Sequence, residues 1–237
     1  MKHFGLVGHP LSHSFSEAYF TEKFQIKGID ADYRLFDFTP FPSKKTLQSL
    51  NLEGFNVTIP YKEKAVTYMD ELSKEAEEIG AVNCVKNMNG HMIGHNTDWL
   101  GFKRSLLQVC KKPIHHALIF GSGGSSKAVQ YALNRLKISY QVVSRSGKVD
   151  YDTISTELVK KSQLLVNTTP LGMHPDINSK PSIPFEAIGD GHIVFDLIYN
   201  PEKTLFLKLA ESNGAHISNG YNMLVEQAEA SWSIWDA

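Results

Sequence analysis

The sequence is poor in the features that mark secreted, membrane-bound or metal-holding proteins. Only two cysteines occur in 237 residues, Cys84 and Cys110, and they form neither a metal-type nor a redox pair. No run of about 18 apolar residues could span a bilayer, and the N-terminus lacks the apolar core of a signal peptide. We therefore expect a cytoplasmic protein with free thiols and no membrane partner.

Positive and negative charges are nearly balanced. The chain has 24 basic and 25 acidic residues, a net charge of -1, and no charged tail, so no nucleic-acid partner is expected. Ten histidines are scattered without metal-type spacing, so no metal site is predicted. The length favours two domains of about 100 residues each.

Strand-like and helix-like segments alternate along the chain, which predicts an α/β fold with parallel sheets and helices on both faces. Ser14 and Glu17 have capping-box spacing at the start of the first helix. The strands predicted before residue 100 are 4–8, 33–38, 54–59, 81–86 and 91–94, the last two forming a hairpin around Asn89-Gly90. The helices predicted there are 16–24, 44–50 and 63–78.

The pattern starts again near residue 100. Predicted strands are 117–120, 141–144, 164–167 and 193–196, and predicted helices are 99–109, 126–136 and 223–235. We expect the last helix to fold back on the first domain.

The segment Asn56-Val-Thr-Ile-Pro-Tyr-Lys62 places two neutral hydrogen-bonding side chains and one ammonium where a strand runs into a helix. Such a set suits a polyhydroxylated substrate whose oxidised carbon gains or loses a proton. Taken alone, the segment is also typical of a solvated helix start, because Lys beside Glu is common on surfaces.

A glycine-rich loop, Gly121-Ser-Gly-Gly-Ser-Ser-Lys-Ala128, lies between an apolar strand and a helix. Gly121 would permit the tight turn, and Gly123 would let the backbone approach a pyrophosphate held by N–H groups at the helix start. Gly124 and Ala128 would keep the helix close to the sheet. The third small residue is displaced from the commonest fingerprint, and a flexible turn is the alternative.

The next predicted strand ends in Ser144-Arg145-Ser146, with Lys148 nearby and no acid before Asp150. NAD sites usually have an Asp or Glu about 20 residues after the glycines. A guanidinium flanked by hydroxyls suits the 2′-phosphate of NADP instead. The sequence thus favours NADP over NAD, unless Arg145 simply faces solvent.

Taken in order, these segments resemble the shikimate dehydrogenase family over nearly the full length. The segments that carry the resemblance are Gly8-His-Pro-Leu-Ser-His-Ser-Phe-Ser16, Asn56 to Lys62, Ala81-Val-Asn83, Asn96-Thr-Asp98, Gly121 to Ala128, Asn167-Thr-Thr169 with Gly172-Met173, Tyr199-Asn-Pro201, and Gly220-x-x-Met-Leu-Val-x-Gln227. The resemblance implies NADPH-dependent, reversible reduction of 3-dehydroshikimate to shikimate on the route to chorismate and the aromatic amino acids.

The resemblance also implies domains and residue roles. Residues 1–99, completed by the helix 221–237, would form an α/β substrate domain, and 100–220 a doubly wound, Rossmann-type NADP-binding domain. Lys62 and Asp98 would be the catalytic pair. Substrate contacts would come from Ser14, Ser16, Asn56, Thr58, Asn83, Tyr199 and Gln227. Cofactor contacts would come from Gly121, Gly123, Gly124, Ser144, Arg145, Ser146, Thr168, Met173, Gly220 and Met223.

The chain departs from the family pattern at Glu17, His95 and Trp99, and a second arginine for the adenosine side is not evident. One alternative is a sister quinate/shikimate dehydrogenase that uses NAD. Another is a non-catalytic binding module or regulator on the same scaffold, which could dispense with Lys62 or Asp98. The oligomeric state, monomer or homodimer, is open.

Overall fold

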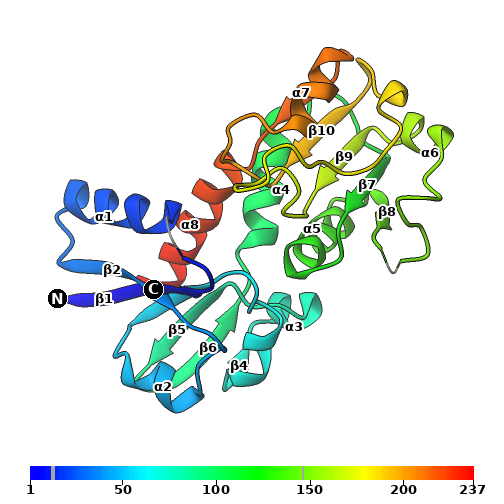
Figure 1. Cartoon of the computed structure of the whole chain (residues 1–237). Helices are drawn as coiled ribbons and strands as arrows, with labels where there is room; N and C mark the ends of the chain where they lie inside the picture. The colour runs from blue at the N-terminus through cyan, green and yellow to red at the C-terminus, as the bar shows by residue number, and fades with distance from the viewer. Residues whose placement is uncertain (12–13, 146) are drawn as a thin grey trace. The chain divides into compact units, whose positions relative to one another are not determined.

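The computed structural model describes residues 1–11, 14–145 and 147–237 of the chain. The chain divides into two compact units (Figure 1). Unit 1 comprises Met1–Asp98 and Gln227–Ala237, and unit 2 comprises Trp99–Glu226. The first crossing follows Asp98, the first residue of α4 (Asp98–Val109), and the second lies within α8 (Tyr221–Trp235).

Unit 1 is built on a six-stranded sheet in the order β2-β1-β3-β5-β6-β4. Its strands are β1 (Lys2–Gly8), β2 (Ala31–Asp37), β3 (Gly54–Val57), β4 (Glu71–Leu72), β5 (Cys84–Met88) and β6 (His91–His95). The prediction of parallel sheets is wrong for this unit, because β5 runs antiparallel to both β3 and β6. The reason is the predicted hairpin, in which Asn89 and Gly90 have φ of 55° and 92° and return the chain at once.

Helices cover both faces of this sheet. They are α1 (Phe15–Lys27), α2 (Lys44–Ser49), the 3-10 helix η1 (Lys64–Tyr68) and α3 (Lys74–Ile79). One face packs against α1 and the end of α8 through Phe20, Phe24 and Trp235, and the other against α2, η1 and α3. The Trp235 indole N–H donates to the Val85 carbonyl at 2.9 Å. The ring lies over Gly54, where a Cβ would come within 2.3 Å of it.

The single helix predicted over 63–78 is wrong. The segment forms η1, the short strand β4 and α3. Asp70 is the physical reason, because its N–H donates to the Met92 carbonyl and its carboxylate accepts the Met92 N–H, both at 2.9 Å, while also binding Lys44. These bonds pull the chain onto the sheet, and Ser73 then starts α3 by capping the Ala76 N–H at 3.2 Å.

Unit 2 confirms the predicted doubly wound fold. Its sheet has the order β11-β10-β9-β7-β8, and all strands are parallel. The strands are β7 (His116–Phe120), β8 (Ser139–Val143), β9 (Leu164–Asn167), β10 (Ile193–Asp196) and β11 (His216–Ser218). The helices besides α4 are α5 (Gly124–Arg135), α6 (Thr156–Lys160), η2 (Phe185–Ala187) and α7 (Leu205–Ser212).

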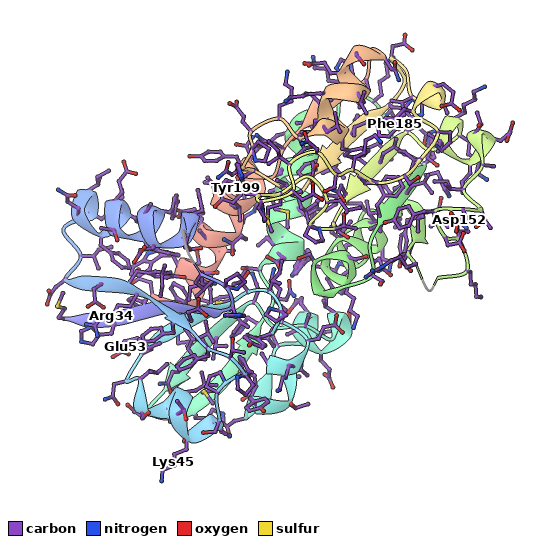
Figure 2. All side chains as sticks on the ribbon, viewed as in Figure 1. Arg34, Lys45, Glu53, Asp152, Phe185 and Tyr199 are labelled. Carbon is purple, nitrogen blue, oxygen red and sulfur yellow. The ribbon has the colours of Figure 1, made fainter. Side chains whose placement is uncertain are left out.

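The three central strands of this sheet, β7, β9 and β10, are buried on both sides. Along β7, Ala117 and Ile119 face the cluster made with α4 and α5, while Leu118 and Phe120 face the cluster made with α6 and α7. The second cluster is extended by Phe185 of η2, labelled in Figure 2, whose ring packs edge-on against that of Phe206 on α7. The continuous apolar runs at 117–120, 164–166 and 193–195 are therefore what a two-sided parallel sheet requires.

Candidate active site

In unit 1, the predicted lysine segment follows a strand at a point where the sheet changes its direction of winding. From β1 the chain passes to β2 on one side and later to β3 on the other, and all three strands are parallel. The loops after the carboxyl ends of β1 and β3 diverge there, which is where open α/β sheets bind ligands. One loop leads to Ser14 and the other carries Thr58 and Lys62.

Ser14 begins α1 as its N-cap. Its backbone is extended (φ -127°, ψ 125°), and its hydroxyl accepts the Ser16 N–H at 3.2 Å. The capping-box spacing predicts a bond to Glu17, three residues on, so the cap is right and the partner is wrong. Ser16, in the first turn, is buried. Two hydroxyls at the start of a 13-residue helix suit a carboxylate, because the N–H groups there attract negative charge.

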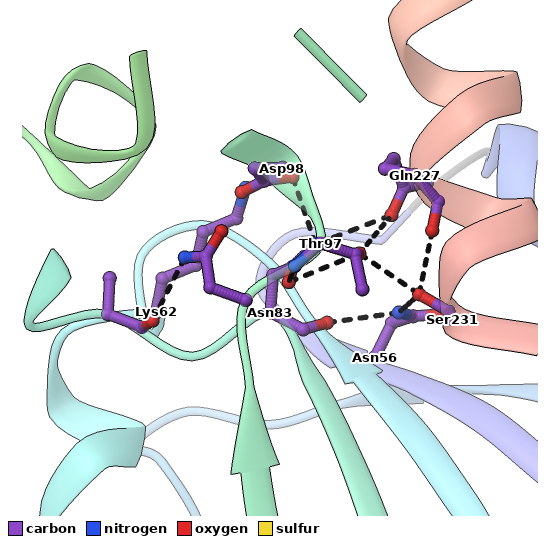
Figure 3. Close-up of polar contacts among 9 residues, drawn as sticks. Asn56, Lys62, Asn83, Thr97, Asp98, Gln227 and Ser231 are labelled. Atoms are coloured by element: carbon purple, nitrogen blue, oxygen red, sulfur yellow. Dashed lines mark hydrogen bonds and ion pairs between the residues drawn. The ribbon is translucent and has the colours of Figure 1, made fainter. Parts of the chain in front are cut away.

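The catalytic pair expected from the resemblance is a part-buried ion pair. The Lys62 Nζ donates to Asp98 Oδ2 at 2.7 Å, and the two side chains are 15% and 6% exposed. Two bonds fix this geometry: the Lys62 carbonyl accepts the Val82 N–H at 2.8 Å, and Asn83 Nδ2 donates to Asp98 Oδ1 at 2.9 Å. Figure 3 shows Asn83 and Lys62 on two sides of the carboxylate.

Three further predicted residues lie in the same hydrogen-bonded group. Gln227, on α8, approaches Asn83 Nδ2 at 3.4 Å and the hydroxyl of Thr97 at 3.5 Å, both long contacts (Figure 3). Asn56 donates to the Asn83 carbonyl at 3.0 Å and accepts the Tyr33 hydroxyl at 2.9 Å. Thr58 directly follows β3, and its N–H donates to the Val7 carbonyl.

Sequence reasoning missed three members of this group: Tyr33, Thr97 and Ser231. Thr97 lies within the Asn96-Thr-Asp98 segment but was not predicted as a site residue, although its hydroxyl contacts Asn83 at 2.9 Å. Ser231 stands four residues after Gln227, so helical spacing places both on one face of α8. That spacing was the available signal. Tyr33, on β2, carries no comparable signal.

The glycine loop of unit 2 lies at the second switch point, between β7 and β9. Gly121 has φ of 111°, and its N–H donates to the Val143 carbonyl at 2.9 Å. A Cβ at this position would lie 2.6 Å from Thr168 Oγ1. Only glycine fits here, and the predicted cofactor residues Gly121 and Thr168 are neighbours.

Gly123 is the N-cap of α5, with φ of -79°, and Gly124 is the first helical residue. A Cβ on Gly123 would meet nothing within 4 Å. This backbone is therefore open at the start of a 12-residue helix, as the close approach of a pyrophosphate requires. Arg145 is exposed just after β8, and Ser144 is buried beside it. The predicted Ser146 lies outside the described residues.

The other predicted residues of unit 2 lie in the loops after β9 and β10, just before α8, and on α8. Met173 is 40% exposed and Tyr199 is half-buried (Figure 2). Gly220 lies against the Leu197 carbonyl, which a Cβ would approach to 2.0 Å, and therefore cannot be replaced without moving the backbone. Met223 is buried in the core cluster between the sheet and α4.

Asp196, the last residue of β10, joins the segments after β9 and β10 by hydrogen bonds. Its fully buried carboxylate accepts the amide of Asn167 at 3.0 Å, the N–H of Ile198 at 3.0 Å and the hydroxyl of Thr204 at 2.7 Å. Burial raises the pKa of Asp196 to about 6, against the lowering effect of these bonds. Through Asn167 the acid also reaches Thr169, whose hydroxyl donates to the Asn167 side-chain oxygen at 2.6 Å.

Within residues 1–11, 14–145 and 147–237, no three His, Cys, Asp or Glu side chains are grouped to hold a metal ion. Over the same residues, the structure contains no helix with the length and apolar character needed to cross a membrane. The candidate chemistry therefore rests on the polar group of unit 1 and the glycine loop of unit 2.

Known proteins resemble this chain over nearly its whole length. Residues 6–85 match the model of the shikimate dehydrogenase substrate binding domain. A shikimate dehydrogenase (NADP(+)) of Caldanaerobacter subterraneus subsp. tengcongensis is 38% identical over 257 residues, which covers 99% of this chain and 91% of the relative.

Solved structures agree with this. The shikimate 5-dehydrogenase of Thermus thermophilus, in complex with NADP(H) and shikimate, is 30% identical with a TM-score of 0.89, over 99% of this chain and 93% of that one. The quinate dehydrogenase of Corynebacterium glutamicum, in complex with NAD, is 27% identical with a TM-score of 0.89, again over 99% and 93%. The sequence identity, the coverage and the two-unit architecture lead to one conclusion: this chain belongs to the shikimate dehydrogenase family.

Proposed function

We propose that the protein catalyses the reversible NADP-dependent reduction of 3-dehydroshikimate to shikimate, a step on the route to chorismate and the aromatic amino acids. The observation that carries this proposal is the part-buried Lys62–Asp98 pair, held by Asn83 at the carboxyl end of β3. A regulator on the same scaffold would not need a proton-bearing ammonium at the ligand-binding edge of the sheet.

In this proposal unit 1 binds the substrate. The Ser14 and Ser16 hydroxyls, at the N-terminus of α1, receive the carboxylate, because that helix end favours an anion. The substrate hydroxyls are bound by Thr58 and Gln227, whose neutral side chains both donate and accept hydrogen bonds, and by the side-chain oxygen of Asn83, which accepts. Tyr199 contributes from the loop after β10.

In this proposal Lys62 is the general acid for reduction and the general base for oxidation. Reduction of a ketone requires a proton at the carbonyl oxygen, and the Lys62 ammonium donates it; in the oxidative direction the same nitrogen receives the proton from the hydroxyl. Asp98 orients the ammonium through the 2.7 Å bond between Nζ and Oδ2. Asp98 stands at the start of α4, where the helix N–H groups interact favourably with a negative charge.

The residues of unit 2 fit NADP(H), which supplies the hydride when bound. The open backbone at Gly123, with the first helical residue Gly124, receives the pyrophosphate, and Gly121 with Thr168 shapes the turn beneath it. Arg145 and its serine neighbours bind the 2′-phosphate, since guanidinium forms bidentate bonds with phosphate oxygens. Met173, Gly220 and Met223 complete the cofactor side of the proposal.

The test is the initial rate of nicotinamide reduction at 340 nm, with shikimate or quinate and with NADP or NAD in all four pairs. Activity confined to shikimate with NADP is the expected result. Turnover of quinate or NAD at similar efficiency would move the protein to the sister class represented by the quinate dehydrogenase of C. glutamicum. Binding of shikimate and NADP by titration calorimetry without turnover would identify a regulator.

The same samples address the remaining parts of the proposal. We propose a cytoplasmic enzyme that is a monomer or a homodimer; the two described cysteines, Cys84 and Cys110, are free thiols. Light scattering during size-exclusion chromatography gives the mass directly, to be compared with 26.5 kDa for one chain.

A further inference from the structure

A fully buried serine, Ser231, is connected to the Lys62–Asp98 pair through Thr97 and Asn83. Ser231 is on α8, one helical turn after Gln227. Its hydroxyl donates to the Gln227 carbonyl at 2.9 Å, accepts Asn56 Nδ2 at 3.0 Å and pairs with Thr97 Oγ1 at 3.1 Å, and it also interacts with the Cys84 side chain. Figure 3 shows these contacts converging on Ser231 from the helix and from the strands below.

The direction of each hydrogen bond in this group can be assigned. Backbone groups fix the two asparagines, because a carbonyl only accepts and an N–H only donates. The Thr97 N–H donates to Asn83 Oδ1 at 2.6 Å, so the NH2 group of Asn83 points the other way. Asn56 Nδ2 faces the Asn83 carbonyl at 3.0 Å, so the second hydrogen of that NH2 group serves Ser231.

The hydroxyl hydrogens follow from the asparagines. Ser231 has one hydrogen, and it is used on the Gln227 carbonyl, so at the contact with Thr97 the threonine must donate. Thr97 Oγ1 then accepts Asn83 Nδ2 at 2.9 Å. In the competing arrangement Thr97 would donate to Asn83 or Gln227 over longer distances of 3.3 and 3.5 Å.

The assigned chain ends on the catalytic carboxylate. Asn83 donates one amide hydrogen to Thr97 Oγ1 and the other to Asp98 Oδ1, both at 2.9 Å. Lys62 is thereby left with Asp98 Oδ2. At the far end, the buried Tyr33 hydroxyl donates to Asn56 Oδ1 at 2.9 Å and also interacts with the side chain of Ser16. Both amide hydrogens of Asn56 are used inside the protein.

We infer that Ser231 is a positioning residue for the Lys62–Asp98 pair: by accepting from Thr97 it keeps Thr97 Oγ1 turned as the acceptor of one Asn83 amide hydrogen, and so helps to hold the amide whose other hydrogen binds Asp98. The inference rests on the proposed function. Asn56 acts with Ser231 as a second positioning residue. Such preorganisation contributes to rate because the reacting groups need not reorganise during the reaction.

Removing the Ser231 hydroxyl gives a specific consequence. In Ser231→Ala a buried Asn56 N–H and the Thr97 hydroxyl lose their shared acceptor, and Thr97 must turn toward Asn83 Oδ1 or Gln227. One Asn83 amide hydrogen then loses its acceptor, so the amide that binds Asp98 is held less firmly, by the Thr97 N–H at its oxygen. Networks of this kind have effects larger than single bonds suggest, because each member fixes the donor direction of the next.

The test compares Ser231→Ala with Ser233→Ala. Ser233 makes the same type of bond, from its hydroxyl to the Glu229 carbonyl at 2.9 Å, but it is exposed on α8. We expect Ser231→Ala to lower kcat about 10-fold, the scale of one unsatisfied buried group, with the Kd for NADP within about twofold of wild type. Ser233→Ala should match wild type in both.

Two further measurements separate positioning from a general loss of stability. Thr97→Val removes the same contact from its other end, so Ser231→Ala should cost clearly less in that background than alone. The side-chain amide proton shifts of Asn83, followed by NMR, should move in Ser231→Ala and stay unchanged in Ser233→Ala. This second readout does not depend on turnover.

Each outcome decides the inference. Unchanged kcat and Asn83 shifts in Ser231→Ala would overturn it, as would strictly additive effects of Ser231→Ala and Thr97→Val. A lowered thermal midpoint with kcat restored on cooling would show a merely structural serine. If the wild-type protein has no activity on shikimate with NADP, the proposed function fails, and the Asn83 shifts alone then judge whether Ser231 sets the geometry.

Discussion

The two units share the same strand order around their first strand, but they place different groups at the carboxyl ends of these strands. In each, the first strand lies between the second and the third, β2-β1-β3 in unit 1 and β8-β7-β9 in unit 2, and the candidate site follows the carboxyl ends of the two strands at the switch. Unit 1 places side chains there, among them Ser14, Thr58 and Lys62. Unit 2 places bare backbone there, at Gly121 and Gly123.

The difference follows from the ligand chemistry that each unit is proposed to serve. A polyol that exchanges a proton needs donors, acceptors and an ammonium in fixed directions, and only side chains provide these. A pyrophosphate needs several N–H groups at close range, and any Cβ there would keep it away. The same topology therefore serves two ligands, because the fold fixes the place and the residues fix the chemistry.

The two buried acids repeat this contrast. Asp98 in unit 1 faces an ammonium, whereas the contacts to Asp196 in unit 2 come from the amide of Asn167, the N–H of Ile198 and the hydroxyl of Thr204, all neutral. One acid belongs to the proposed chemistry, and the other joins the loops after β9 and β10. Variants at each site can sharpen the distinction.

The largest effect is expected for Lys62→Ala, which removes the only group of the Lys62–Asp98 pair that can donate a proton. We expect kcat to fall about 100-fold or more, the usual scale for loss of general acid–base catalysis, while the Kd for NADP is unchanged because the cofactor residues lie in unit 2. Steady-state kinetics and calorimetry measure the two quantities. Lys64→Ala, which changes an exposed lysine two residues on, is the matched control, and near-normal turnover of Lys62→Ala would remove Lys62 from the mechanism.

The glycines of unit 2 give an intermediate effect and a matched pair. Gly121→Ala places a Cβ 2.6 Å from Thr168 Oγ1 on a backbone with φ of 111°, so both the thermal midpoint and NADP affinity should fall. Gly123→Ala meets nothing within 4 Å, so the thermal midpoint should hold while NADP binds about 10-fold more weakly or worse.

Calorimetry with NADP and with shikimate separates these outcomes. Shikimate affinity should stay the same in both glycine variants, because unit 1 is unchanged. Wild-type affinity for NADP in Gly123→Ala would contradict the idea that the pyrophosphate approaches this backbone closely.

The smallest effect is expected for Asp196→Asn, and it concerns stability. The pKa of Asp196 is raised by burial from 3.8 to about 6, so between these pH values the folded protein holds a proton that the unfolded chain releases. The ionised acid therefore lowers the free energy of unfolding as pH rises from about 4 to 6, and the loss is complete above that range. Asparagine keeps the shape without the titration, and Thr204 can accept as well as donate.

The measurement is the thermal midpoint of wild type and Asp196→Asn from pH 4 to 8. The difference should shift in favour of the variant by a few °C as pH rises through 6, with turnover at optimal pH little changed. Asp190→Asn, which alters an exposed acid of unit 2, should follow the wild-type curve. A difference that is constant with pH would show that Asp196 does not titrate in this range.

Local sequence patterns predicted most of the strands and helices, and the reasons are physical. The predicted strands 164–167 and 193–196 are confirmed as β9 and β10, since their apolar runs 164–166 and 193–195 suit strands buried on both faces. The Asn89-Gly90 turn was predictable from backbone preference alone. The helix over 63–78 failed because Asp70 binds Met92, a residue 22 positions away, and no local pattern encodes such a bond.

The residues of the candidate site also fall into those that local sequence predicted and those that only tertiary contacts brought together. Lys62 and the glycine loop were singled out because each lies where a strand runs into a helix, and Asp98 was expected from the family resemblance. Ser231 and Tyr33 were missed because they act through Asn56, which stands 175 and 23 residues away from them. Such partners meet only when separate elements pack on the same strand.

The sequence by itself determined the α/β alternation, the turn at Gly121 and the residue types that the proposed chemistry needs, since these depend on backbone preference and on spacing within single elements. The tertiary structure alone decided that β5 runs antiparallel, that α8 brings Gln227 and Ser231 onto Asn83 and Thr97, and that burial raises the pKa of Asp196. Those outcomes depend on desolvation and on contacts between distant segments, which exist only after the chain has packed.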